Sequence, residues 1–178
     1  MAELSVGDEL VAQFDAAGNL VGACPRSVMR RDNLWHAASS IVVRGPADDV
    51  YLHRRTLSKD VFPGLLDFAA GGVVLADEDP AVGALRELDE ELGVHGADLV
   101  PLGVVTYADD HTRYHAHRFF TTWDGAIRWQ AEEVAWGDWV PLRDLVTRLD
   151  REPGTFVPDS IAVWLPVLRR WDGHGRMS

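Results

Sequence analysis

The chain has 178 residues, 47% of them apolar, and a formal net charge of −11. This size and composition suit one globular domain that buries about two thirds of its unfolded surface. The acidic charge argues against nucleic-acid binding, because it repels phosphate backbones. No apolar run approaches the roughly 20 residues of a membrane helix. The single cysteine, Cys24, permits no intramolecular disulfide, and the first residues lack the pattern of a signal peptide. We therefore expect a cytoplasmic protein that binds neither membranes nor nucleic acids.

The first elements along the chain are predicted to be short. Residues 9–14 and 19–23 are typical of strands, and the turn-forming residues between them favour a hairpin. A short helix is predicted over 27–33, with Ser27 as its N-cap. This hairpin has a free edge through which a homodimer could form.

Three segments are expected from these signals. Residues 1–33 form an N-terminal extension, residues 34–171 form the main domain, and the Gly-rich, polar residues 172–178 form a flexible tail.

The main domain alternates predicted strands with predicted helices. Strands or extended segments are expected over residues 37–44, 50–54, 66–74, 99–107, 115–123 and 133–140. Helices are expected over residues 80–92, 142–149 and 158–170. Strands flanked by helices on both sides indicate an α/β fold, an α/β/α sandwich with a central mixed sheet.

The helix over 80–92 has the clearest signals. Asp79 can serve as N-cap, Pro80 suits the first helical position, and Gly93 suits the C′ position. Apolar residues recur at helical spacing and predict the buried face: Val82, Leu85, Leu88 and Leu92.

Three carboxylates share one face of this helix. Glu87 lies three residues before Glu90 and four before Glu91, so the side chains are within reach of one another. Like charges at this spacing destabilise a helix, and a cation relieves the repulsion. Hard oxygen ligands of this kind suit Mg²⁺ or Mn²⁺. The alternative is a solvated helix face with no ligand.

The pattern around these glutamates resembles the signature of the Nudix hydrolase family. The signature runs Gly72, five residues, Glu78, seven residues, Arg86-Glu87-Leu88, one residue, Glu90-Glu91, one residue, Gly93-Val94. Seven of these nine positions are counted as fixed identities, leaving aside the apolar Leu88 and Val94. At a frequency of roughly 6–7% each, they would match by accident in about 10⁻⁸ of windows. The match is therefore specific, and it implies the Nudix fold.

The resemblance also implies roles for these positions. The metal would be held by the three glutamates with the carbonyl of Gly71 or Gly72, and Arg86 would order the site by pairing with a glutamate. Glu78 would anchor the loop, and Gly72 and Gly93 belong to the structural part of the signature.

The implied chemistry is attack of water on a phosphoanhydride bond, with Mg²⁺ as the expected metal and Mn²⁺ as an alternative. The substrate would be a small-molecule diphosphate, such as a nucleoside diphosphate linked to another moiety. A general base is required. Glu133, with Glu132 beside it, is one candidate, and Glu90 on the helix is the other.

Within the family, the segment from His53 resembles the branch related to isopentenyl-diphosphate isomerase, which includes the YfcD-like bacterial hydrolases. The matching stretches read HRRTLSKDVFPGLLDFAAGGV and, at 158–160, PDS. The resemblance implies that Arg55 and Lys59 contact the diphosphate, although both could instead be exposed loop cations.

Departures from the isomerase pattern favour hydrolysis. The expected cysteine is missing from residues 69–74, and residues 112–120 contain no carboxylate. Isomerase-like activity and a non-catalytic, nucleotide-binding Nudix domain remain as alternatives.

Histidines and tryptophans give weaker signals. His115 and His117 fall on one face of a predicted strand, but no third ligand is spaced to complete a metal site. His36 matches an isomerase metal position without its companions. We expect ordinary hydrogen-bonding roles for these histidines, and core packing for Trp164.

Overall fold

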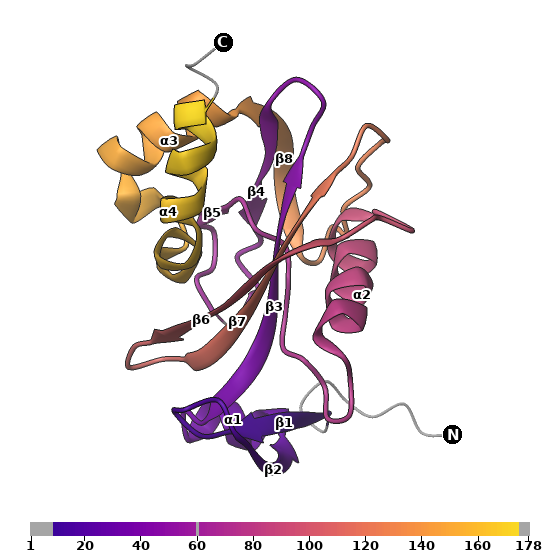
Figure 1. Ribbon diagram of the computed structural model, residues 1–178, viewed down its shortest axis with the longest axis vertical. Coiled ribbons are helices and arrows are strands. Elements are labelled where there is room, and N and C mark those ends of the chain that lie inside the picture. The colour runs from indigo at the N-terminus through magenta and orange to yellow at the C-terminus, as the bar shows by residue number, and fades with distance from the viewer. Residues whose placement is uncertain (1–8, 60, 175–178) are drawn as a thin grey trace.

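The computed structural model describes residues 9–59 and 61–174, and Figure 1 shows the arrangement of its elements. The strands are β1 (Leu10–Phe14), β2 (Leu20–Pro25), β3 (Trp35–Arg44), β4 (Asp49–Arg55), β5 (Leu66–Asp67), β6 (Val100–Ala108), β7 (Arg113–Thr122) and β8 (Val134–Pro141). The helices are α1 (Arg26–Arg31), α2 (Pro80–Leu92), α3 (Leu142–Arg151), the short 3₁₀ helix η1 (Pro153–Thr155) and α4 (Pro158–His174). Of the predicted tail, residues 172–174 belong to α4, and 175–178 lie outside the described residues.

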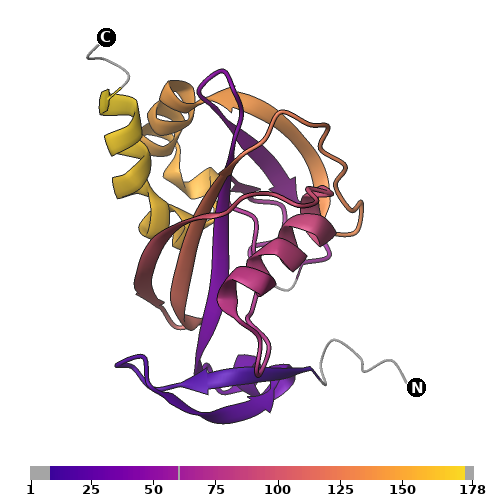
Figure 2. The same cartoon turned by 45° about the vertical axis from the view of Figure 1, so that its right-hand side comes forward.

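The sheet lies between two helical layers. Helix α2 covers one face, and α3 and α4 cover the other, as the two views in Figures 1 and 2 agree. Strands β3 and β7 are parallel, whereas β6 pairs with β7 and β8 pairs with β4 in antiparallel fashion. The predicted α/β/α sandwich with a mixed sheet is therefore confirmed. No helix in the described part of the chain is long and apolar enough to cross a membrane.

Strands β3 and β4 separate soon after their hairpin, and this separation makes room for the site. Their only paired residues are Arg44 and Val50. The segment from Ala70 to Val74 takes the place beside β3 that β4 leaves. Isolated bridges join Ile41 to Ala70 and Ala38 to Val73. The predicted extended segment thus follows β3 as irregular backbone, and only its first two residues form a strand.

Helix α2 has the predicted ends. The Asp79 side chain accepts a hydrogen bond from the Ala81 amide at 2.8 Å, and Gly93 ends the helix with φ of 63°. A side chain is disfavoured at Gly93 both by this φ and by the Arg128 carbonyl, which would lie 2.8 Å from an added Cβ.

The buried face of α2 is rotated from the predicted one. Val82 and Leu85 are exposed, at 58% and 38%. Leu88 and Leu92 are buried as predicted, together with Gly83, Ala84 and Glu91. Small residues at the start of the helix let it approach its neighbours closely, so the prediction of an apolar stripe through Val82 and Leu85 was wrong.

The opposite face of the sheet carries the larger core. Trp164 of α4 is fully buried there, and its indole Nε1 donates to the Ser40 hydroxyl at 2.8 Å. Phe68 and Phe156 are also buried in this cluster. The expected core role of Trp164 is confirmed.

The N-terminal segment pairs with the main sheet. Strand β1 pairs with β2 along its length and with β3 at Gln13 and His36. Helix α1 begins after Pro25 and has no side-chain cap, so the prediction of Ser27 as its N-cap was wrong.

Candidate functional site

The site centres on the two glycines that run beside β3. The Ser39 amide donates to the Gly72 carbonyl at 2.9 Å, which fixes this backbone against the strand. Gly71 has φ of 147°, and a Cβ there would lie 2.1 Å from the Ser39 carbonyl oxygen. At Gly72 a Cβ would lie 2.4–2.6 Å from the carboxylate of Glu87. Glycine is therefore required at Gly71 for this backbone to lie so close to β3, and a side chain at Gly72 would displace the Glu87 carboxylate.

Glu91 projects from α2 into this junction and is buried. Its Oε2 accepts a hydrogen bond from the Gly71 amide at 3.2 Å, and its Oε1 lies 3.8 Å from the Lys59 ammonium. Burial raises the pKa of Glu91 to about 7, because desolvation disfavours the charged form. Burial also lowers the pKa of Lys59, although the nearby carboxylates oppose this shift.

Lys59 also forms an ion pair with Glu133, so a single ammonium joins two of the predicted site acids. The loops that carry these residues are tied together. The Thr56 amide donates to the Glu133 carbonyl at 3.1 Å, and the Thr56 hydroxyl donates to the Glu132 carbonyl at 2.8 Å. The structure therefore brings Lys59, Glu91 and Glu133 together from three separate segments.

Arg86 organises the other side of the carboxylate helix. Its Nε and Nη2 donate to the two oxygens of Glu78 at 3.0 and 3.1 Å, and Nη1 donates to Glu87 at 2.7 Å. A weaker contact of 3.4 Å reaches Glu90. Hydrogen bonding to Glu78 and the charge of Glu87 raise the pKa of Arg86. Glu78 also accepts from the Leu75 amide at 2.9 Å, which anchors the loop before α2.

The glutamates differ in exposure. The Glu87 side chain is 13% exposed, and burial raises its pKa, whereas the Glu90 side chain is 52% exposed. Carboxylates beside a glycine backbone have the oxygen chemistry that a divalent cation needs. Among the described residues, however, no three His, Cys, Asp or Glu side chains are arranged to surround one ion. The glutamates are directed instead toward Arg86 and Lys59.

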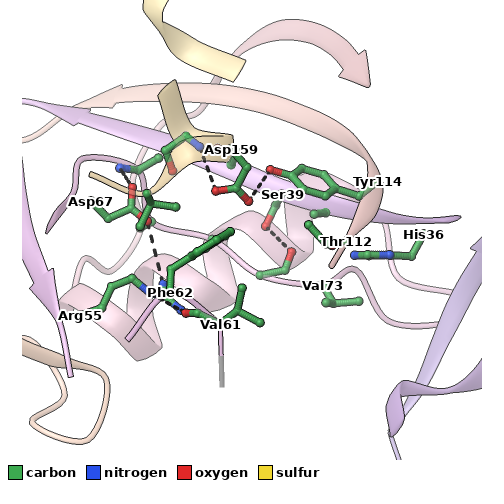
Figure 3. Close-up of a pocket in the computed structure, with 18 of the residues that line it drawn as sticks. His36, Ser39, Arg55, Val61, Phe62, Asp67, Val73, Thr112, Tyr114 and Asp159 are labelled. Carbon is green, nitrogen blue, oxygen red and sulfur yellow. Dashed lines mark hydrogen bonds and ion pairs between the residues drawn. The ribbon is translucent and has the colours of Figure 1, made fainter. Parts of the chain in front are cut away.

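A cavity of about 130 Å³ opens on the other side of Gly71 and Gly72 (Figure 3). Arg55 lies in its wall, with Nε and Nη2 donating to the Val61 carbonyl at 3.2 and 3.0 Å and Nη1 at 3.9 Å from Asp67. The two predicted diphosphate ligands therefore take different places, since Lys59 faces the glutamates and Arg55 faces the cavity.

Three cavity residues were missed by the sequence analysis. Asp67 accepts from the amides of Phe68 and Ala69, and Asp159 accepts from the Tyr114 hydroxyl at 2.8 Å. Asp159 belongs to the PDS stretch, which the sequence analysis used only as part of a family resemblance and to which it assigned no site role. No local pattern signals that Asp67, Tyr114 and Asp159 meet.

Two of the histidines, His36 and His115, make the hydrogen bonds expected of them. His36 is buried and its Nδ1 lies 3.0 Å from the Leu34 carbonyl, while His115 Nε2 lies 2.9 Å from the Asp15 carbonyl. His115 also stacks on Trp35. Burial lowers the pKa of His36 to about 4.

Comparisons with known proteins agree with this arrangement. The family model described as the NUDIX domain matches residues 34–160. The Nudix hydrolase orf19 of Rhodococcus erythropolis, itself uncharacterized, is 39% identical over 172 residues, covering 91% of this chain and 93% of the relative. The uncharacterized Nudix hydrolase YfcD of Escherichia coli K12 is 34% identical over 160 residues, covering 88% and 87%.

The fold agrees with a solved structure as well. DR0079 from Deinococcus radiodurans superposes with a TM-score of 0.72 at 20% identity, covering 91% of this chain and 98% of that protein. The complete signature on α2, the family-model match and the two relatives together place this chain in the Nudix hydrolase family.

Proposed function

We propose that this protein hydrolyses a phosphoanhydride bond in a small-molecule diphosphate and depends on a divalent metal, Mg²⁺ in the first place and Mn²⁺ as a substitute. The family as a whole supports hydrolase activity that uses a divalent metal. The observation that carries the proposal is the junction at Gly71, where buried Glu91, Lys59 and Glu133 meet.

The proposed metal ligands are Glu87, Glu90 and Glu91, with the carbonyl of Gly71. We favour Gly71 over Gly72 because the Gly72 carbonyl already accepts from the Ser39 amide. A bound metal would polarise the phosphoryl oxygens and lower the pKa of water. Lys59 would have to leave Glu91 for the cation to enter, and its ammonium would then be free to bind the diphosphate.

The remaining roles belong to the chain's own side chains. Arg86 holds Glu87 in place through the 2.7 Å hydrogen bond and is itself fixed by Glu78. Such support tightens the geometry of a ligand that would otherwise rotate. Arg55 and Lys59 supply positive charge to a diphosphate that crosses from the glutamates to the cavity.

Two residues are candidates for the general base. Glu133 forms an ion pair with Lys59, so its carboxylate would become free to accept a proton when Lys59 binds a phosphate instead. Glu90 is the more exposed of the helix glutamates and can reach water directly. A base in either position would remove the proton of the attacking water.

The test is phosphate release from a panel of diphosphates, with Mg²⁺ and with EDTA. Glu90→Gln should reduce turnover by about 10²–10⁴-fold. Asp89→Asn is the matched control, because Asp89 is the neighbouring exposed acid and its carboxylate pairs with His95 at 2.7 Å. Turnover that survives EDTA, or equal losses in the two variants, would contradict the proposal.

The same assay separates the two bases. If Glu133 is the base, Glu133→Gln loses turnover with little change in the Mg²⁺ concentration that gives half-maximal rate. If Glu90 both binds metal and removes the proton, only Glu90→Gln loses turnover to that extent.

A further inference from the structure

The cavity beside Gly71 and Gly72 has Asp67 and Asp159 toward one end and His36 toward the other (Figure 3). Tyr114 lies between them, with its ring centroid 5.7 Å from that of His36, and Arg55 lies beside the carboxylate end. Figure 3 shows Asp159 between Asp67 and Tyr114, with Arg55 and Phe62 on the opposite side.

Size limits what this cavity can hold. Its volume of about 130 Å³ is small beside the roughly 300–1,000 Å³ of pockets for drug-sized ligands. The cavity therefore suits a compact group better than a whole nucleoside.

Hydrogen-bonding capacity limits its chemistry. The Asp159 oxygens each accept one hydrogen bond, from the Tyr114 hydroxyl at 2.8 Å and from the Ser160 amide at 3.0 Å. A carboxylate can accept about four. The unused lone pairs can be satisfied only by donors, so a carboxylate-lined end favours a guest that donates.

The charges around Asp159 also favour a guest that donates hydrogen bonds. Asp67 lies 3.9 Å from Arg55, whereas the hydrogen-bond donors to Asp159 are neutral groups. Partial burial and the neighbouring charge of Asp67 raise the pKa of Asp159 to about 6. A donor that also carries positive charge would relieve both effects.

We propose that this cavity receives the end of the substrate remote from the phosphates, and that Asp159 selects a compact group bearing hydroxyl or ammonium donors. The inference rests on the proposed function, because it takes Arg55 to meet the diphosphate in the cavity wall. It narrows the substrate to a diphosphate of a small polyol or amino alcohol, with any larger moiety outside the cavity.

Three diphosphates of equal size test the proposal: butyl, 3-hydroxypropyl and 3-aminopropyl diphosphate, which differ only in a terminal methyl, hydroxyl or ammonium group. We expect the wild type to prefer one or both donor-bearing compounds over the butyl compound by at least about tenfold in kcat/KM, roughly 1.4 kcal/mol. Preference for 3-aminopropyl over 3-hydroxypropyl diphosphate would identify the guest as a cation. Equal rates for these two compounds, both above the rate for the butyl compound, would identify the guest as a neutral donor.

Asp159→Asn should reduce this preference at least about fivefold, and Asp138→Asn, which changes an exposed acid of β8, should leave it intact. Equal rates for all three compounds, or a preference unchanged in Asp159→Asn, would overturn the inference.

Calorimetric binding of the same compounds to the Glu90→Gln protein separates this inference from the proposed function. If no compound is hydrolysed but donor-bearing compounds bind more tightly, the function fails and the cavity assignment stands. If all three are hydrolysed and bind alike, the cavity assignment fails and the function stands. If none binds or is hydrolysed, both fail.

Discussion

Two groups of acids flank the Gly71–Gly72 segment, and they are held in different ways. On α2, Glu87 faces Arg86 and Glu91 faces Lys59, so each buried glutamate has a cation beside it. In the cavity, Asp159 is held by the neutral Tyr114 hydroxyl and a backbone amide.

The difference bears on function. Acids that already have a cationic partner are arranged to exchange that partner for another cation. An acid that is held by neutral donors keeps spare lone pairs for a ligand, and a cationic ligand would favour its charged form. We infer that the first group serves the reaction and the second serves substrate selection.

The largest effect on stability and turnover is expected from removing Arg86, the cation that orders the helix glutamates. Arg86→Met breaks the bidentate contact with Glu78 and the bond to Glu87, and removes the guanidinium that pairs with both carboxylates. Because the Arg86 side chain is only 29% exposed, we expect a loss of about 2–3 kcal/mol in the free energy of unfolding. Turnover should fall about 10–100-fold. Chemical denaturation and phosphate release measure the two effects.

Arg86→Lys sharpens this prediction, because it keeps the charge and loses the fork geometry. It should fall between the wild type and Arg86→Met in both measurements. A lysine variant as active and stable as the wild type would show that charge alone orders Glu87.

Asp159→Asn is expected to change the free energy of unfolding by a smaller amount than Arg86→Met, and to raise it rather than lower it. The pKa of Asp159 is raised to about 6 from an ordinary 3.8, so the folded protein holds this proton more tightly than the unfolded chain. The resulting stability is complete below about pH 4 and is lost as pH rises through about 6. The variant should therefore gain about 2 kcal/mol on the wild type between pH 4 and pH 7.

Free energies of unfolding at several pH values measure this gain. A difference between the variant and the wild type that stays constant over the range would show that Asp159 titrates normally, and would weaken the contrast with the paired glutamates.

The smallest effect is expected from Tyr114→Phe, which removes one neutral donor from Asp159. A lost hydrogen bond of this kind costs about 1–2 kcal/mol at a buried site. Tyr107→Phe is the matched control, because the Tyr107 hydroxyl donates to Asp109 at 2.9 Å in a more exposed position. Thermal unfolding should show the larger loss in Tyr114→Phe, and equal losses would argue that Asp159 does not depend on its buried donor.

The sequence could place the three glutamates on one helix because they lie close together along the chain, whereas their role as metal ligands stays a prediction. Spacing of three and four residues places Glu87, Glu90 and Glu91 on one face whatever surrounds the helix. The caps at Asp79 and Gly93 are equally local, and the structure has both.

The cavity group could not be predicted in this way. Asp67 and Asp159 lie far apart in the sequence and meet only because β5 and the start of α4 are adjacent, as the bridge between Leu66 and Phe156 shows. The helix face failed for a related reason. Gly83 is buried against the Glu78 side chain and Ala84 in the core against β3, and hydrophobic spacing alone does not contain that information.

We infer that the helix glutamates serve the reaction and that Asp159 serves substrate selection. The most direct test of this claim is to measure Mn²⁺ affinity by electron paramagnetic resonance in the absence of substrate. We expect the wild type and Asp159→Asn to bind Mn²⁺ equally, and Glu91→Gln to bind it at least about tenfold more weakly. Equal binding by all three proteins, or weakened binding in Asp159→Asn alone, would contradict the account.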